Sequence, residues 1–331
     1  MAFRIDPEQA HEWTLNLMRL VGNIAPLRWL LSLLFKPPLR PVEAFGLKFT
    51  NPVGLAAGYD KNGIAVRGLA CLGFGHIEVG TVTPQAQPGN ERPRLFRLVE
   101  DEALINRMGF PGRGADFVAN QLQRARPKDV VLGINIGKNK DTPIEEAAQD
   151  YLVVMRALYP FADYLAINVS SPNTVGLRQL QARQALEALL AVLLEERRAL
   201  STRFGREAPL LVKLAPDLSE SELEDALGAM LDAQIEGVIA TNTTLGRGAL
   251  RSPNAKESGG LSGTPLRSRS TAMIRKINQF TEGKLPIIGV GGIMSPQDAM
   301  EKLEAGATLV QVYTGLVYRG PFLVREIVQA L

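Results

Sequence analysis

Short apolar stretches rich in β-branched residues alternate with helical stretches over most of the chain. Eight apolar stretches have the length of a buried strand, and they fall at 53–56, 77–80, 130–136, 164–169, 210–214, 237–241, 287–290 and 309–313. Helical patterns follow them near 62–73, 113–124, 144–158, 182–203, 219–233, 268–281, 296–305 and 321–330. Eight strands alternating with eight helices predict an α/β fold of the (β/α)8 TIM-barrel type. A doubly wound sheet is the alternative, but it usually has fewer strands.

Two insertions interrupt this rhythm, at about 84–110 after the second strand and at about 244–267 after the sixth. Both follow the carboxyl end of a strand. Barrels carry their active sites on that face, so we expect both insertions to border the functional site.

Residues 1–41 are predicted to form a helical segment ahead of a barrel domain at 42–331. Asp6-Pro7 provides a helix cap and a first-turn proline, and this helix is predicted to run to about Val21. A second helix is predicted over 27–35, which reads LRWLLSLLF and is apolar on almost every face. It spans only about half of a bilayer core, so we expect it to lie in the membrane interface. The alternative is that this hairpin is ordinary core capping the barrel.

Composition disfavours several classes of protein. Hydrophobic residues make up 46% of the 331 positions and charged residues 21%, which suits a large folded core. The net charge is only +3, and no Lys/Arg run is interleaved with aromatics, so no nucleic-acid partner is expected. Cys71 is the only cysteine and there are two histidines, so we predict neither a metal site nor an iron–sulfur cluster within the chain. A reducing cytoplasm fits this cysteine usage.

Polar residues gather at the predicted strand ends, where apolar residues would be expected. They are Thr81, Asn135, Asn168, Lys213, Thr241, Asn242 and Thr243. Such groups could satisfy one another or bind water, since buried amides need partners. Their common position nevertheless predicts a polar ligand at the mouth of the barrel.

Glycines follow the last two predicted strands. Gly291-Gly292 comes after the seventh strand, and Tyr313-Thr314-Gly315 comes after the eighth. Backbone N–H groups approach a phosphate closely only where no Cβ intervenes, and these two loops form the usual phosphate site of such barrels. The run GVGGIM resembles part of a dinucleotide fingerprint. It lacks the third glycine and an early βαβ setting, so we reject a Rossmann interpretation.

The stretch INVSSPNT, at 167–174, breaks an apolar strand into a turn that Pro172 fixes. Ser171 is therefore either an ordinary turn residue or a catalytic serine. It is not predicted to belong to a Ser-His-Asp triad, because neither histidine lies near this motif.

Together these motifs resemble class 2 dihydroorotate dehydrogenases, the membrane-associated, quinone-using class, over essentially the whole chain. The resemblance rests on NPVGLAAGYDKNG (51–63), GFGHIEVGTVTPQAQPGN (73–90), INRMGF (105–110), GINIGKNKDTP (133–143), INVSSPNT, KLAPDL (213–218), GGLSG (259–263) and PIIGVGGI (286–293). Class 1 members carry Cys in place of Ser171 and lack the two N-terminal helices, so both features favour class 2.

The resemblance implies one FMN per chain, with its phosphate nearest Gly292 and Thr314. The implied FMN contacts are Ala57, Gly58, Tyr59, Asp60, Lys61, Thr81, Asn135, Asn168, Lys213, Thr241, Gly263, Gly292, Tyr313 and Thr314. The implied contacts of dihydroorotate or orotate are Lys61, Asn106, Arg107, Met108, Gly109, Phe110, Asn168, Asn173, Asn242 and Thr243. Planar rings with N–H and C=O groups suit Asn side chains, which both donate and accept hydrogen bonds.

The resemblance also implies the chemistry. Ser171 would be the base that takes the C5 proton while a hydride leaves C6 for FMN N5, in de novo pyrimidine (UMP) synthesis. Thr174 and Phe110 match positions thought to organise a proton relay from that serine.

A membrane quinone is the implied electron acceptor, reached through a tunnel beside the N-terminal helices and lined by His11, Arg97 and Tyr313. The implied state is a monomer without an iron–sulfur partner subunit, bound peripherally to the cytoplasmic face of the cell membrane. Removal of residues 1–41 is expected to spare flavin reduction by dihydroorotate and to abolish reoxidation by long-chain quinone. The alternatives are another barrel enzyme, either a flavin oxidoreductase or a non-flavin aldolase or isomerase, and a non-catalytic membrane-surface protein.

Overall fold

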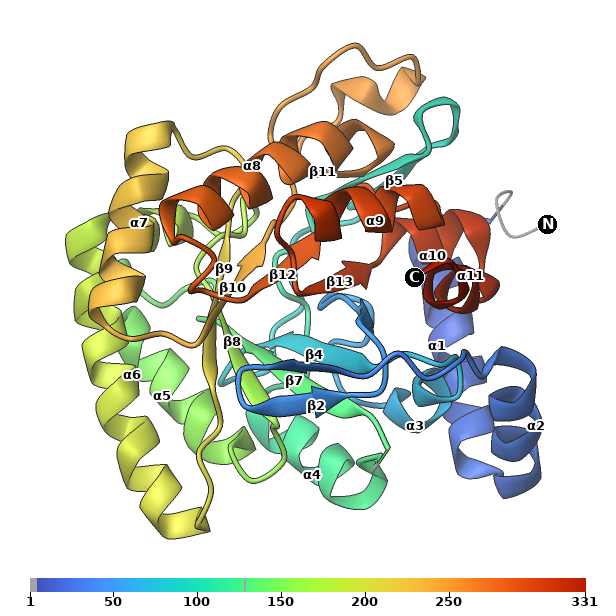
Figure 1. The fold of residues 1–331 in the computed structure, drawn as a ribbon, viewed down its shortest axis with the longest axis horizontal. Coiled ribbons are helices and arrows are strands. Elements are labelled where there is room, and N and C mark those ends of the chain that lie inside the picture. Colours follow the sequence, from blue (N-terminus) through green and yellow to red (C-terminus); the bar gives the residue numbers. More distant parts are fainter. Residues whose placement is uncertain (1–4, 128) are drawn as a thin grey trace.

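A closed barrel of eight parallel strands forms the centre of the computed structural model, which describes residues 5–127 and 129–331 (Figure 1). Its strands are β3 (Val53–Leu55), β4 (His76–Val82), β7 (Val131–Ile136), β8 (Tyr164–Asn168), β9 (Leu210–Leu214), β10 (Gly237–Ala240), β12 (Ile287–Val290) and β13 (Leu309–Val312). Around the barrel they run β10-β12-β13-β3-β4-β7-β8-β9. The predicted TIM barrel is confirmed, and each predicted strand ends within two residues of the observed one.

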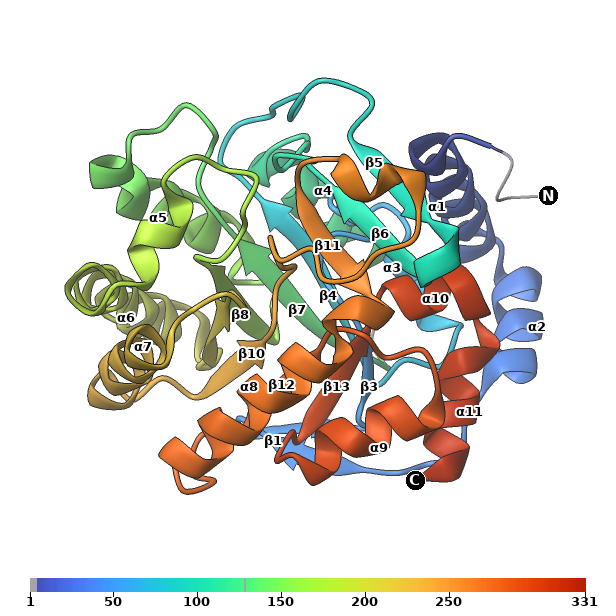
Figure 2. The same ribbon diagram turned by 90° about the horizontal axis from the view of Figure 1, so that it is seen from above.

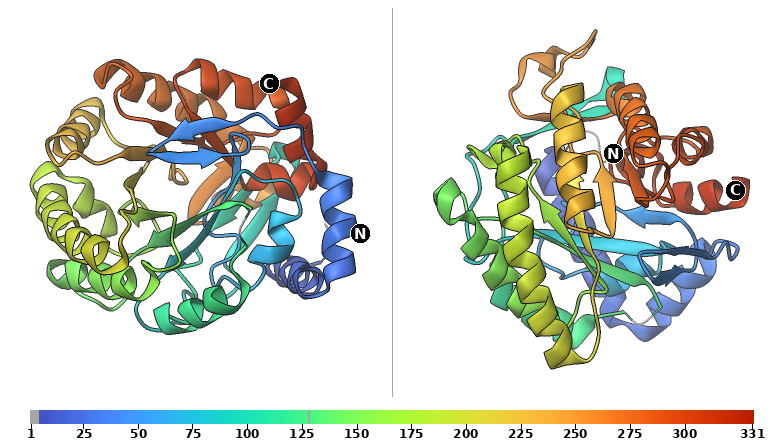
Figure 3. Two further views of the ribbon diagram at one scale, coloured as in Figure 1. Left: turned by 60° about the horizontal axis from the view of Figure 1, so that its bottom comes forward. Right: turned by 60° about the vertical axis from the view of Figure 1, so that its left-hand side comes forward.

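Helices surround the strands, as the left view of Figure 3 shows. They are α3 (Val66–Ala70), α4 (Ala115–Ala125), α5 (Ala147–Leu158), α6 (Arg183–Phe204), α7 (Glu220–Asp232), α8 (Arg267–Phe280), α9 (Pro296–Glu304), α10 (Thr314–Arg319) and α11 (Phe322–Ala330). The strands are buried on both faces. One apolar cluster lies between strands and helices, and a second, containing Ala166, Leu211, Ile239 and Ile288, fills the barrel interior. This double burial explains why the strands appear in the sequence as continuous apolar runs.

A β-hairpin that was not predicted from the sequence closes the amino-terminal end of the barrel. It consists of β1 (Val42–Ala44) and β2 (Leu47–Phe49), and Phe49 packs in the interior cluster. Strands of three residues are too short for alternation to be recognised.

The two predicted insertions pair with each other above the barrel. β5 (Leu95–Leu98) and β6 (Ala103–Asn106) come from the first insertion, and β11 (Gly260–Gly263) comes from the second. They form one antiparallel sheet in the order β11-β6-β5, which lies over the barrel strands in Figure 2. Five 3-10 turns complete the described elements: η2 (Val99–Asp101), η3 (Ile144–Glu146), η4 (Leu177–Gln181), η5 (Pro253–Lys256) and η6 (Thr264–Leu266).

The N-terminal segment forms the two predicted helices, α1 (Pro7–Asn23) and α2 (Ala25–Phe35). Asp6 caps α1 by accepting hydrogen bonds from the backbone of Glu8 and Gln9. α1 packs on α3, whereas only Phe35 of α2 is buried. Taken singly, none of the described helices has the length and apolar composition of a membrane span. α1 and α2 pass that test only together, and they are bent by 111°.

Large apolar side chains on the helical hairpin formed by α1 and α2 face outward. They are Trp13, Leu17, Leu20, Ile24, Leu27, Trp29, Leu30, Leu33 and Leu34. The alternative that the hairpin is ordinary core therefore does not fit, because a core helix would bury these side chains.

Candidate active site

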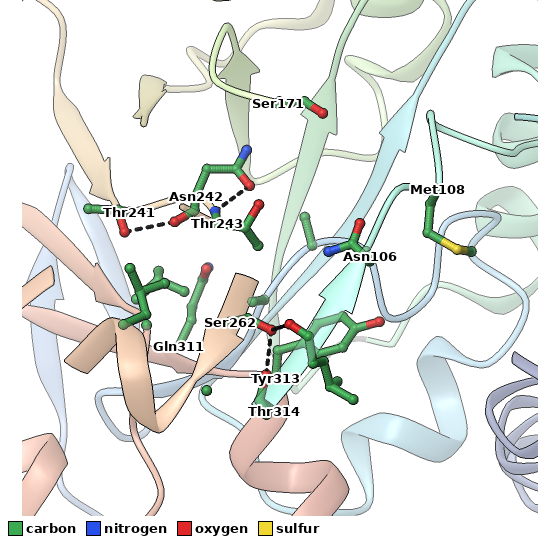
Figure 4. Close-up of a pocket in the computed structure, with 18 of the residues that line it drawn as sticks. Asn106, Met108, Ser171, Thr241, Asn242, Thr243, Ser262, Gln311, Tyr313 and Thr314 are labelled. Carbon is green, nitrogen blue, oxygen red and sulfur yellow. Dashed lines mark hydrogen bonds between the residues drawn. The ribbon is translucent and has the colours of Figure 1, made fainter. Parts of the chain in front are cut away.

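A cavity opens at the carboxyl end of the barrel strands, beneath the sheet of the two insertions. It contains about 1170 Å³ of empty space up to its open mouth. Figure 4 shows Thr241, Asn242 and Thr243 on one side, with Asn106 and Met108 opposite them. The part of the chain that the structure describes contains no group of three or more His, Cys, Asp or Glu residues placed to hold a metal ion.

Most of the predicted site residues line this cavity. They are His11, Ala57, Gly58, Lys61, Thr81, Asn106, Met108, Gly109, Phe110, Asn168, Ser171, Asn173, Lys213, Thr241, Asn242, Thr243, Gly263, Gly292, Tyr313 and Thr314. They come from most of the barrel strand ends and from both insertions. The barrel thus brings together the residues that were singled out separately along the sequence.

Three predicted residues bond to one another in the cavity floor. The Thr81 hydroxyl and Asn168 Nδ2 both donate to Asn135 Oδ1, at 2.5 and 3.1 Å. Below them, Asn135 Nδ2 donates to Glu78 at 2.8 Å, and Lys213 Nζ lies 3.5 Å from the same carboxylate. These amides satisfy one another, as one interpretation predicted, while Thr81, Asn168 and Lys213 also face the cavity.

Glu78 and Gln311 are not among the residues predicted from the sequence. Glu78 is fully buried in β4 and accepts hydrogen bonds from Gln311 Nε2 at 2.9 Å and from the Tyr164 hydroxyl at 3.1 Å. Gln311 in β13 lines the cavity. Both could have been found by asking which polar residues interrupt otherwise apolar strand patterns. Glu78 supplies the counter-charge of Lys213 beneath the site.

Gly263 and Gly292 line one end of the cavity, the glycine cradle, and each packs tightly against neighbouring backbone. Gly292 has φ +75°, and a Cβ there would lie 2.4 Å from Arg267 Cα. Gly263 has φ +95°, and its Cβ would lie 3.0 Å from Thr314 Cγ2. Ser262 Oγ and Thr314 Oγ1 are 2.9 Å apart at the same end of the cavity. Because glycine has no side chain, N–H groups of these loops can approach a phosphate closely, so the cradle fits the phosphate of FMN.

The predicted catalytic serine lies on the loop after β8. Ser171 is 4% exposed, lines the cavity and accepts a hydrogen bond from the backbone N–H of Asn173 at 3.2 Å. That bond fixes the hydroxyl oxygen while leaving it facing the cavity. Thr174 is buried three residues further on and does not line the cavity.

Amide side chains crowd around this serine. Asn173 Nδ2 donates to Asn106 Oδ1 at 3.2 Å, and Asn242 Nδ2 donates to Ser170 Oγ at 2.9 Å. Lys61 Nζ donates to the Gly58 carbonyl at 2.5 Å. Burial lowers the pKa of Lys61 to about 8. A small planar ligand with a negative charge fits these groups.

Some predicted residues lie behind the lining: Tyr59, Asp60, Arg97, Asn135, Arg107 and Thr174. The Asp60 carboxylate accepts backbone N–H groups of its own loop, with the Ala65 bond at 2.7 Å. Arg107 pairs with Glu257 at 2.6 Å, and Arg97 donates to the Ile5 carbonyl at 2.7 Å. Their predicted ligand contacts stay predictions.

An aromatic group connects α1 with the cavity. The His11 and Tyr59 rings lie 4.9 Å apart, and the Tyr59 and Tyr313 rings lie 5.7 Å apart. Burial, together with the nearby Lys61 charge, lowers the pKa of His11 to about 3, so this imidazole is neutral at ordinary pH. His11 and Tyr313 both line the cavity.

Comparison with known proteins agrees with this geometry. A sequence model described as dihydroorotate dehydrogenase matches residues 41–331. Relatives named dihydroorotate dehydrogenase (quinone) from Burkholderia thailandensis and Cronobacter sakazakii are 53% and 52% identical over 330 residues, covering 99% of this chain and 94% and 97% of theirs. The crystal structure of DHODH in complex with ferulenol from Eimeria tenella is 39% identical with a TM-score of 0.87, covering 98% of this chain and 90% of that one.

The relatives match the N-terminal helices as well as the barrel, since the alignments cover nearly the full chain. Their names are those of oxidoreductases, and the class predicted from the motifs is the quinone-using class that these names give. The prediction is therefore confirmed, and this chain belongs to the dihydroorotate dehydrogenase family.

Proposed function

We propose that this protein oxidises dihydroorotate to orotate through a bound FMN, with a quinone as the final electron acceptor, in de novo pyrimidine synthesis. The observation that carries the proposal is a single cavity that joins a glycine-lined cradle, the Lys213 ammonium and Asn side chains around Ser171. When bound, FMN accepts a hydride from the substrate and passes electrons on to the quinone. This cavity would hold one FMN per chain.

The backbone at Gly263 and Gly292 would hold the FMN phosphate, because glycine N–H groups can approach it without an intervening Cβ, and Thr314 would contact it from the same end of the cavity. The other FMN contacts would come from the cavity residues Ala57, Gly58, Lys61, Thr81, Asn168, Lys213, Thr241 and Tyr313. Lys213 supplies positive charge at the cavity floor, which favours the negative charge that reduction adds to a flavin. Tyr59, Asp60 and Asn135 would act from behind this lining.

Asn106, Asn173 and Asn242 would bind the substrate ring, since each amide matches either an N–H or a C=O group. Lys61 would meet the substrate carboxylate. Asn168, Thr243 and the cavity-lining residues 108–110 would complete this subsite, with Arg107 outside the lining.

Ser171 would take the C5 proton as a hydride leaves C6, so that the C5=C6 double bond forms. A neutral hydroxyl is a weak base, so Ser171 must pass on its own proton as it receives the new one. Thr174 and Phe110 would organise that relay toward solvent. Phe110 lines the cavity, and Thr174 is buried next to the serine loop.

The quinone would approach between α1 and the barrel, past His11, Tyr313 and Arg97. The exposed apolar faces of α1 and α2 support this route, because long-chain quinones reside in membranes. Arg19, Lys36 and Arg40 are exposed around those faces, where they would meet anionic headgroups. We therefore propose a monomer bound peripherally to the cytoplasmic face of the cell membrane.

An absorbance spectrum followed by anaerobic titration tests the proposal. The protein should be yellow with about one FMN per chain, dihydroorotate should bleach it, and a soluble quinone should restore the colour. A yellow protein that dihydroorotate does not bleach would be a flavin enzyme with another substrate. A folded, colourless protein that does not take up FMN would refute the proposal altogether.

A further inference from the structure

A buried ion pair joins the N-terminal helices to the barrel. Glu8 in the first turn of α1 and Arg94 just before β5 are each 7% exposed. Arg94 Nη2 donates to Glu8 Oε1 at 2.7 Å, and Arg94 Nε donates to the two carboxylate oxygens at 3.1 and 3.2 Å. Burial alone would raise the pKa of Glu8, but Arg94 and Arg92 outweigh it and hold that pKa below its usual value. Glu8 is therefore ionised at neutral pH.

The remaining nitrogen of Arg94 holds the loop that leads into β5. Nη1 donates to the carbonyls of Pro88 and Asn90, at 2.6 and 2.7 Å. One guanidinium group thus fixes this loop relative to α1. A flexible or monodentate cation would not hold the carboxylate and two carbonyls at once.

Asn90 carries this constraint to the proposed substrate subsite. Its Nδ2 donates to the carbonyls of Arg107 at 2.9 Å and Asn173 at 3.4 Å, and its backbone N–H donates to the Met108 carbonyl at 3.0 Å. A Cβ on Gly109 would lie 2.7 Å from the Asn90 side chain, so the two loops are closely packed. The chain of contacts from Glu8 therefore reaches the two segments that carry Asn106 and Asn173.

Glu8 also acts on the charge of the subsite. Burial lowers the pKa of Lys61 to about 8, Glu8 and Asp60 raise it, and Arg94 lowers it. Lys61 in turn lowers the pKa of the neighbouring His11. Without Glu8, Lys61 would lose an opposing charge and keep the repulsion of Arg94.

We infer that Glu8 is a positioning residue for the dihydroorotate subsite, acting through Arg94 and Asn90 on the subsite loops and through its charge on Lys61. The inference rests on the proposed function. It means that α1, which is proposed to receive the quinone, also completes the site of the other half-reaction.

Full-length, FMN-loaded Glu8→Gln tests the inference, with Glu12→Gln as the matched control. Glu12 lies one turn further along α1, and its carboxylate pairs with exposed Arg92 at 2.9 Å. Glu8→Gln should raise the dihydroorotate concentration that half-saturates anaerobic flavin reduction by roughly three- to thirtyfold, the usual range for a residue acting through intermediate contacts. The control should stay within about twofold, as exposed ion pairs contribute little.

The pH profile separates positioning from general destabilisation. In the wild type, substrate binding should weaken as pH rises through about 8 and Lys61 loses its proton. We call this loss of substrate binding at high pH the alkaline limb. In Glu8→Gln the alkaline limb should move to lower pH, whereas in Glu12→Gln it should not move. Glu8→Asp, which keeps the charge but is too short for both Arg94 contacts, should retain the wild-type limb and show an intermediate half-saturating concentration.

The inference would be overturned if Glu8→Gln had the wild-type half-saturating dihydroorotate concentration and lost substrate binding at the same pH as the wild type. A loss confined to quinone reoxidation would also overturn it, because Glu8 would then only anchor α1. If Glu8→Gln does not fold, Glu8→Asp decides: a wild-type half-saturating concentration in this variant would equally overturn the inference. If dihydroorotate fails to bleach the wild-type protein, the proposed function itself is refuted.

Discussion

Leu30→Asp combined with Leu34→Asp should detach the protein from membranes without disabling its chemistry. Both side chains lie on α2, where they are 53% and 48% exposed. Full burial of a leucine side chain contributes about 1.5–3 kcal/mol, so the exposed half of each can contribute roughly 1 kcal/mol on entering lipid. Losing both corresponds to about thirtyfold weaker partitioning, at about 1.4 kcal/mol per factor of ten. The introduced carboxylates add repulsion from anionic lipid.

Sedimentation with vesicles containing anionic lipid measures this partitioning. Leu231→Asp is the matched control, because Leu231 is 38% exposed on α7, which lies away from α2 (Figure 1). The control should bind vesicles like the wild type. In the double variant, a short-chain soluble quinone should still reoxidise the flavin, since neither leucine lines the cavity. If the double variant sediments with vesicles as the wild type does, α2 is not the membrane-contacting surface.

Three further predictions concern the cavity itself. Ser171→Ala should retain substrate binding but slow flavin reduction by roughly two to four orders of magnitude in stopped-flow measurements, while Ser171→Cys keeps part of the rate; an undiminished rate in Ser171→Ala would assign the base elsewhere. Gly292→Ala should weaken FMN binding at least about tenfold, combining roughly 1–2 kcal/mol of backbone strain with a Cβ placed 2.4 Å from Arg267 Cα. Gly320 has φ +77° and open space around it, so Gly320→Ala is the control for backbone strain alone. Equal FMN affinities in Gly292→Ala and Gly320→Ala would argue against the cradle as the phosphate site. Because the pKa of His11 is lowered to about 3, the rate of flavin reoxidation by quinone should not change with pH near 6.5. A pH dependence near 6.5 that His11→Asn removes would contradict the lowered pKa.

Local patterns were sufficient for the barrel and for much of the site lining. A parallel strand buried on both faces is a continuous apolar run, so eight such runs could be recognised without knowing their partners. Gly292 and Thr314 could be placed because the carboxyl ends of barrel strands share one face, which turns order along the chain into proximity. Family motifs added the proposed roles of Ser171 and the Asn residues, which periodicity does not reveal.

Pairing between distant segments could not be predicted in this way. Asn106 of β6 pairs with Gly260 of β11. The two residues belong to different insertions, and nothing in the sequence indicates that these insertions pair. Glu78 becomes a counter-charge only because the closed barrel places it 3.5 Å from Lys213. Short polar segments carry no signal for their partners, since their pairing depends on how the barrel positions them.

The N-terminal segment shows the same division. Its two helices and their apolar character follow from local sequence: a proline-capped start and a run of leucines. From these alone, removal of residues 1–41 was expected to spare the dihydroorotate reaction. Glu8 meets Arg94 across 86 residues of chain, and Arg94 holds the loops of the proposed subsite. Local sequence determines which surfaces a helix offers, whereas the folded chain decides which buried charges they meet, because such a pair forms only once both segments have left water.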